Sequence, residues 1–198
     1  MTKLHQAPII SLRPTQLTVG WREVEHKRKR LHALSAPARL KFLQAHPMPV
    51  VIGPERQLYI TDHHHLARAA LEAGVTGGFF MIEADLSRHD LAKFWVLMNR
   101  KQWVHPLDQH GVRHHYQAIP TRLDELLDDV YRSLAGFVRD AGGYRKTPTA
   151  FAEFIWADFF RRNIAIEQVQ TDFDSAVRDA KRLARSPIAK RIPGFKRK

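Results

Sequence analysis

One strand-like segment of this chain runs straight into a helix-like segment through a polar turn. The segment, Tyr59 to Ala69, reads Tyr-Ile-Thr-Asp-His-His-His-Leu-Ala-Arg-Ala. A strand followed directly by a helix favours folds that mix the two kinds of element. The first N–H groups of a helix lack partners within it and carry partial positive charge, so such a junction suits an anion. We therefore expect a phosphate-binding turn, called here the histidine turn (Asp62 to Arg68). Its expected donors are His63, His64, His65 and Arg68.

The residue types of the histidine turn allow more than one chemistry. Three adjacent histidines cannot all face one metal from a regular helix, because successive residues are rotated by roughly 100°. Asp62 could act as a base or metal anchor, His64 as a proton-transfer group or phosphate donor, and Arg68 as a stabiliser of transition-state charge. The alternative is that Asp62 is simply the helix N-cap and the histidines form its exposed first turn.

The charge of the chain favours polyanionic partners. Its 198 residues include 32 Lys and Arg against 20 Asp and Glu, a net charge of +12. Such a field attracts nucleic acid and nucleotides. One basic block is Lys27 to Arg30, and nine further Lys or Arg lie between Arg178 and Lys198. Lys27 and its neighbours could contact a phosphate chain, or the block could be an ordinary solvated surface.

Several classes of protein are disfavoured by what the sequence lacks. There is no cysteine, which excludes disulfides, thiolate metal sites and cysteine nucleophiles. No apolar run approaches the roughly 20 residues of a membrane helix. The start, Met1 to His5, lacks the apolar core of a signal peptide. We expect a cytoplasmic protein that does not interact with membranes.

Strand signals lie in the first half of the chain. Val50-Val51-Ile52 and Leu58-Tyr59-Ile60 flank a turn-rich link and predict a β-hairpin, and another strand is expected over Phe79 to Glu83. An extended segment is expected around Pro8 to Leu12. The expected helices are Gly20 to Leu34, Ala36 to Ala45, one that follows Asp62 and ends at Gly74, and one that begins between Ser87 and Asp90. Their expected inward residues are Trp21, Val24 and Leu31; Leu66, Ala70 and Ala73; and Leu91, Phe94, Trp95 and Met98.

Beyond about residue 105 the pattern becomes helical. Long helices are predicted over Thr121 to Ala141, Pro148 to Arg162 and about Asp172 to Arg185. We therefore divide the chain into an α/β domain, 1–105, and a helical extension packed on it, 106–198. In the first of these helices, Asp128 could pair with Arg132 four residues later as an ordinary surface ion pair. Asp108, His110 and His114 could share a metal if they lay on one helix, although Gly111 weakens that helix.

Five motifs together resemble a known family. The first three are Met48-Pro49-Val50-Val51, the Tyr59 to Ala69 segment, and Ala69-Ala70-Leu71-Glu72-Ala73-Gly74. The other two are Leu127-Asp128-Asp129-Val130-Tyr131-Arg132-Ser133-Leu134-Ala135 and Phe151-Ala152-Glu153-Phe154-Ile155-Trp156-Ala157-Asp158. These residues resemble the ParB-like nuclease superfamily, whose ParB/sulfiredoxin core is shared by partition ParB proteins, sulfiredoxins and a free-serine kinase. The chain is most similar to the bacterial ParB-like nuclease branch. The resemblance implies an α/β (α+β) fold: a small mixed sheet with helices, plus a helical C-terminal extension.

The chain departs from its relatives at the ligand turn. Partition proteins of the superfamily hold a nucleotide triphosphate with a Gly-Glu-Arg-Arg motif, which would fall on His63, His64, His65 and Leu66 here. The glycine and both arginines are absent. Sulfiredoxin-like members use a cysteine in this turn, so the composition excludes their chemistry. The helix-turn-helix region with which partition proteins read DNA is not evident between Thr121 and Arg185.

The resemblance places a ligand site at the histidine turn. It implies binding of a nucleotide (ATP, ADP or CTP) or of a nucleic-acid phosphate, with Mg²⁺ as the expected ion. It also suggests a supporting role for Asp128, Asp129 and Arg132, because their helix could close over the turn. Phosphoester hydrolysis by a nuclease and phosphoryl transfer are both compatible with these residues. The alternative is a non-catalytic DNA-binding module that uses its basic surface, with binding that falls steeply with salt.

Overall fold

The computed structural model describes residues 3–196 and divides the chain into two compact units. The first unit comprises residues 1–19, 24–108 and 112–127, and the second comprises 20–23, 109–111 and 128–198. The last two residues of the basic tail, Arg197 and Lys198, lie outside the described residues. Among the described residues, no helix combines the length and the apolar character that crossing a membrane requires.

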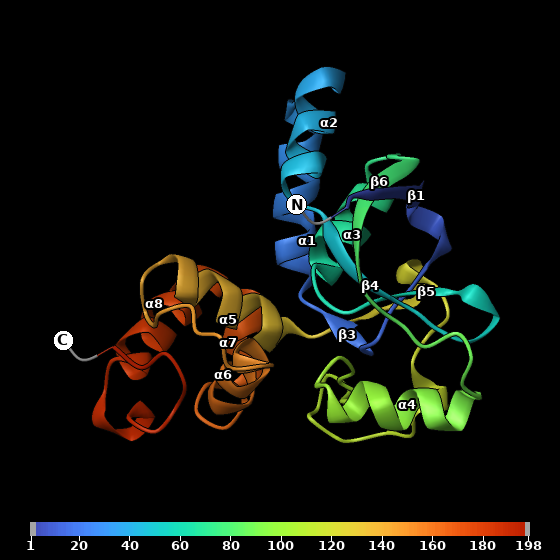
Figure 1. Ribbon diagram of the computed structural model, residues 1–198. Coiled ribbons are helices and arrows are strands. Elements are labelled where there is room, and N and C mark those ends of the chain that lie inside the picture. Colours follow the sequence, from blue (N-terminus) through green and yellow to red (C-terminus); the bar gives the residue numbers. More distant parts are fainter. Residues whose placement is uncertain (1–2, 197–198) are drawn as a thin grey trace. The chain divides into compact units, whose positions relative to one another are not determined.

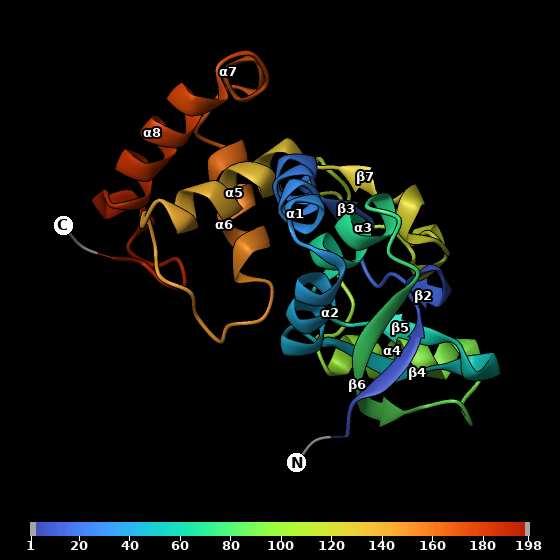
Figure 2. The same cartoon turned by 90° about the horizontal axis from the view of Figure 1, so that it is seen from above.

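The first unit is built on a mixed five-stranded sheet (Figure 1). Its strands are β1 (His5–Pro8), β2 (Leu12–Arg13), β4 (Met48–Ile52), β5 (Leu58–Ile60) and β6 (Gly77–Asp85), in the spatial order β1-β6-β4-β5-β2. The predicted hairpin is confirmed, because β4 and β5 pair antiparallel with Val50 opposite Ile60. β1 also pairs antiparallel with β6, and Figure 2 shows these two strands side by side. The remaining neighbours, β4 with β6 and β2 with β5, are parallel.

Helices cover both faces of this sheet. They are α1 (Trp21–Ala33), α2 (Ala36–Ala45), α3 (His64–Glu72) and α4 (Leu91–Arg100). Side chains alternate between the faces of a strand, so Val50 and Ile60 join the core under α1, α2 and α3. Val51 and Tyr59 point the other way, into a core with Phe94 of α4. Figure 1 shows α4 on the opposite side of the sheet from α3.

The predicted elements of the first unit are largely confirmed, with local corrections. Val24, Leu31, Leu66, Ala70, Ala73, Phe94, Trp95 and Met98 are buried as expected. Trp21 and Leu91, however, are 51% and 49% exposed, since each is the first residue of its helix. Asp90 is the N-cap of α4, through a bond from Lys93 N–H. The predicted extended start is interrupted by a 3-10 turn, η1 (Ile9–Ser11); a second, η2 (Pro54–Arg56), links β4 to β5.

The second unit is a helical bundle. Its helices are α5 (Val130–Asp140), α6 (Ala152–Arg161), α7 (Ile166–Thr171) and α8 (Phe173–Ala184), followed by the 3-10 turn η5 (Pro187–Ala189). α5 contacts α6, α7 and α8 around a core that includes the fully buried Trp156 and Phe160. α6 begins four residues later than Pro148, and the short α7 was not predicted. Asp172 caps α8 with a bond from Ser175 N–H.

The predicted helix over Thr121 to Ala141 is wrong in its first half. The chain there forms the 3-10 turn η4 (Leu123–Glu125) and then β7 (Leu127–Asp128), which pairs with β3 (Thr18–Val19); another 3-10 turn, η3 (Tyr116–Ala118), lies before Thr121. The apolar residues of the predicted helix belong to two different hydrophobic cores. Leu123 and Leu126 belong to the core of the first unit, whereas Leu134 and Val138 belong to that of the second.

Candidate functional site

The histidine turn joins the end of β5 to the start of α3 within the first unit. His63 is the N-cap of α3 and adopts a left-handed conformation, with φ of 66°. Its side chain makes no capping hydrogen bond; instead, Asp62 Oδ1 accepts from the His63 N–H at 2.6 Å. Positive φ is uncommon for a residue other than glycine and marks a position held by its surroundings. The alternative in which Asp62 itself is the N-cap is therefore wrong.

His64 and His65 are buried, so they do not form an exposed first turn. Thr15 N–H donates to His64 Nε2 at 3.1 Å, and the Thr15 hydroxyl lies 3.3 Å from the same nitrogen. The hydroxyl also donates to the carbonyl of Ile60 at 2.7 Å. A ring nitrogen that accepts from an amide carries no proton, so the His64 proton is on Nδ1. Thr15 therefore occupies Nε2 of His64.

The carboxylate of Asp62 and the Nε2 atom of His64, predicted as a proton-transfer pair, have different hydrogen-bond partners. The Asp62 carboxylate is exposed and accepts from its neighbour, whereas His64 Nε2 accepts from Thr15. The preceding residue, Thr61, donates its hydroxyl to Glu83 Oε2 at 2.6 Å. The turn therefore presents a solvent-facing carboxylate next to histidines that are held by the fold.

Arg68 has a structural task. Its Nη1 donates to the carbonyl of Leu123 at 2.7 Å, and its Nε donates to Glu72 Oε1 at 2.5 Å. Its side chain is only 12% exposed. Arg68 therefore joins α3 to η4, and these bonds occupy two of its donors.

Lys27 is half-buried in α1, where the next two basic residues, Arg28 and Lys29, both pair with Glu25.

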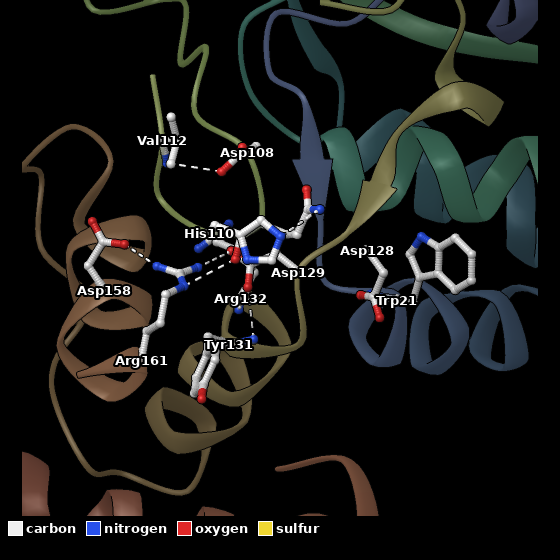
Figure 3. A network of polar contacts seen from close by, with 11 residues as sticks. Trp21, Asp108, His110, Val112, Asp128, Asp129, Tyr131, Arg132, Asp158 and Arg161 are labelled. Carbon is white, nitrogen blue, oxygen red and sulfur yellow. Dashed lines mark hydrogen bonds and ion pairs between the residues drawn. The ribbon is translucent and has the colours of Figure 1, made fainter. Parts of the chain in front are cut away.

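A second concentration of charge lies in the second unit, at the start of α5 (Figure 3). Asp129 is the N-cap of α5 and accepts from the N–H groups of Tyr131 and Arg132 at 2.9 and 3.4 Å. Its other oxygen accepts from Arg161 Nη2 at 2.6 Å. Arg161 also contacts Asp158 and donates from Nε to the carbonyl of Gln109 at 3.1 Å. Burial raises the pKa of Asp129, and the nearby guanidinium of Arg161 opposes that rise.

Asp128 does not pair with Arg132, so the predicted ion pair is wrong. Asp128 lies in β7, outside the helix, and its Oδ1 accepts from Trp21 N–H at 2.9 Å. Arg132 is 4% exposed; its Nη2 lies 3.3 Å from Glu153 Oε2, and its guanidinium carbon lies 4.0 Å from the Phe154 ring centre. Burial lowers the pKa of Arg132. Asp128 and Arg132 thus secure the starts of different helices.

The three-residue metal site at Asp108, His110 and His114 is not formed as predicted. These residues are not on a helix, and Gly111 has a positive φ of 78°. Asp108 accepts from Val112 N–H at 2.9 Å and lies 2.7 Å from His114 Nε2, whereas His110 belongs to the other unit. Over residues 3–196, the side chains form no cluster of three or more potential metal ligands.

Three contributors to these arrangements were not predicted. Thr15, Glu153 and Arg161 lie far in sequence from their partners His64, Arg132 and Asp129. Glu153 belongs to a motif that carried the family resemblance, which was the available signal for it. Thr15 contacts His64 partly through its backbone N–H, a group that every residue except proline has. The identity of residue 15 therefore could not predict this contact.

Comparisons with known proteins place the chain in a family. The family model described as "Putative ParB-like nuclease" matches residues 5–162. The crystal structure of protein Atu1540 from Agrobacterium tumefaciens is 39% identical over 99% of both chains, with a TM-score of 0.91. The C-terminally truncated partition protein ParB from Caulobacter crescentus, complexed with CTP-gamma-S, is 15% identical over 96% of this chain and 98% of that one, with a TM-score of 0.33. Among curated proteins none matches. The predicted ParB-like α/β fold is confirmed, and the chain belongs to the ParB-like nuclease family.

Proposed function

We propose that the histidine turn binds the phosphate of a nucleotide or of a nucleic acid. The observation that carries the proposal is the strand-to-helix junction itself. α3 starts four residues after β5 ends, and its N-cap, His63, has the left-handed conformation. A left-handed residue followed by helical residues turns successive N–H groups toward one side and forms a concave site for an anion. The positive end of the helix dipole adds to this attraction.

The side chains of the turn can take separate roles toward that phosphate. The imidazoles of His63 and His64 would be its side-chain donors. Arg68 contributes less than its charge suggests, because Glu72 and Leu123 already hold its guanidinium. In phosphoester hydrolysis, the exposed Asp62 would accept the proton of an attacking water while the new P–O bond forms. The departing ester oxygen would then need a proton, which an imidazolium could supply.

Mg²⁺ fits this site as a companion of the phosphate. Magnesium is commonly bound by one or two carboxylates together with phosphate oxygens and waters. Asp62 is the carboxylate within the histidine turn. Because residues 3–196 offer no cluster of three ligands, the ion would arrive with the nucleotide and be held through Asp62 and the phosphates. Its chemistry there would be neutralisation of phosphate charge.

The test is thermal stabilisation by ATP, ADP, CTP, GTP and short duplex DNA, with Mg²⁺ and with EDTA. A ligand that binds only the folded state stabilises it by about 2.7 kcal/mol at 100 times its Kd. The informative variants are Asp62→Ala, which removes an exposed carboxylate, and His63→Gly, which removes an imidazole where glycine tolerates the backbone. His89→Ala is the control, because His89 is exposed and outside the turn.

We expect a ligand-specific shift that His63→Gly reduces and His89→Ala preserves. Asp62→Ala should reduce the part of the shift that depends on Mg²⁺. No shift with any nucleotide or DNA would refute the proposal. A salt-sensitive DNA shift that survives both turn variants would also refute it, because the binding surface would then lie elsewhere on the protein.

A further inference from the structure

Four cations lie on one face of α8: three are within the helix and the fourth, Arg185, is its C-cap. Arg178, Lys181, Arg182 and Arg185 occupy positions i, i+3, i+4 and i+7, and we call them the basic stripe. At a rise of about 1.5 Å per residue, the stripe extends for roughly 10 Å along the helix. The opposite face is in the core, where Ala176, Ala180 and Ala184 are fully buried. The position of the stripe therefore follows from the packing of α8, which leaves Arg178 and Arg182 exposed and Lys181 and Arg185 half-buried.

The basic stripe borders a shallow hollow of about 330 Å³, lined by its four members and Asp179. Arg185 Nη2 donates to the carbonyl of Gly142 at 2.7 Å, which fixes the direction of that guanidinium. Asp179 accepts from Gln168 Nε2 at 2.8 Å and contacts Arg182. Those two interactions lower the pKa of Asp179, so it remains ionised and offsets one of the four positive charges.

The chemistry of the stripe selects one class of partner. An amphipathic helix that binds membranes inserts an exposed apolar face, whereas the apolar face of α8 is buried within the protein. Proteins that bind single-stranded nucleic acid stack bases on aromatic side chains, and the stripe contains none. Three of its members are arginines, whose guanidinium groups match phosphate oxygens in a bidentate way. Basic residues also continue in the sequence after α8, at Lys190, Arg191 and Lys196.

We propose that the basic stripe binds the phosphodiester backbone of duplex DNA, without reading its sequence. This site lies on a different unit from the histidine turn and does not depend on it. Contacts to phosphates release condensed counterions, so log K falls with log salt at a slope of about −0.9 per contact. Four contacts predict a slope of about −3.6, or a loss of affinity of roughly 150-fold between 50 and 200 mM salt.

The experiment is fluorescence anisotropy with a labelled duplex at several salt concentrations. The double variant Lys181→Ala/Arg182→Ala should bring the slope to about −1.8, so affinity falls only roughly 12-fold over the same range. The matched control is Lys93→Ala/Arg100→Ala, which removes the same charge from two exposed positions of α4. We expect the control to keep the wild-type slope. Equal slope changes in both double variants would overturn the proposal, because net charge alone would then explain binding.

A variant expected to gain affinity separates the proposal from misfolding. Asp179→Asn removes the carboxylate charge beside the stripe but keeps an oxygen that can accept from Gln168. We expect it to bind duplex DNA several-fold more tightly at 50 mM salt. Unchanged or weaker binding by this variant would overturn the proposal. So would absence of duplex binding by the wild-type protein, or tighter binding to single strands or to anionic lipid vesicles.

Discussion

The pair of Asp129 and Arg161 offers a quantitative test of how the second unit is stabilised. Asp129 is 2% exposed, and Arg161 Nη2 lies 2.6 Å from its carboxylate. Arg161→Met keeps much of the side-chain length but removes the cation, which leaves a buried carboxylate uncompensated. Breaking a buried pair in this way typically costs about 3–5 kcal/mol. For a chain of this size, that corresponds to a fall in Tm of about 6–20 °C.

The deficit should depend on pH with a definite sign. Burial raises the pKa of Asp129 in the folded state, and Arg161 opposes that rise, so the variant raises it further. A folded protein with a raised carboxyl pKa binds the proton more tightly than the unfolded chain does. Its relative stability is therefore greatest at low pH and is lost as pH rises through the folded-state pKa. The variant should be most destabilised at pH 7.5 and should recover part of the deficit near pH 4.5.

Urea unfolding followed by circular dichroism at the two pH values measures this difference. Arg162→Met is the matched control: it makes the same substitution one residue later, at an exposed position, and should change the unfolding free energy by less than about 0.5 kcal/mol. Figure 3 draws His110 in the same network as Arg161, so the measurement is repeated with His110→Asn. An equal deficit at both pH values would refute the reasoning that Asp129 carries the buried charge.

Two further substitutions test the packing of the second unit. Gly136→Ala should destabilise the protein by about 1–3 kcal/mol in urea unfolding, because a Cβ there would overlap Glu23 Oε1, and an unchanged midpoint would contradict that packing. Tyr131→Phe should cost about 1 kcal/mol, because it removes the 2.8 Å bond to the carbonyl of Ile164; a Tm equal to that of the wild type would show that this bond contributes nothing.

Local patterns predicted the first unit well because each element there carries its own signal. The Gly53-Pro54 link between two apolar, strand-like segments specified the hairpin, and Gly74, with φ of 71°, ends α3 as expected. The start of α5 could not be placed in the same way. Apolar spacing continues unbroken through Leu126 and Leu127, so only the cap formed by Asp129 shows where the helix begins.

The elements around the candidate site were predicted, but the contacts of its side chains were not. The strand, turn and helix around Asp62 were read from local sequence, and they form as expected. The partners of His64 and Arg68 are Thr15 and Leu123, which lie 49 and 55 residues away and contribute backbone groups. Nearly every residue has a backbone amide and a carbonyl, so residue identity cannot predict which of them is the partner. These partners could be found only from the structure.

The first turn of α1 has a consequence for the order in which the chain folds during synthesis. Trp21 N–H donates to Asp128, 107 residues later, and Arg22 N–H donates to Ser133, 111 residues later. Ribosomes add about 5–20 residues per second, so α1 emerges roughly 5–20 s before its own caps exist. During that interval the N–H groups of Trp21 and Arg22 can donate only to water. A nascent chain halted before residue 128 would therefore contain α1 with a frayed beginning, and translation itself sets the earliest moment at which this helix can be completed.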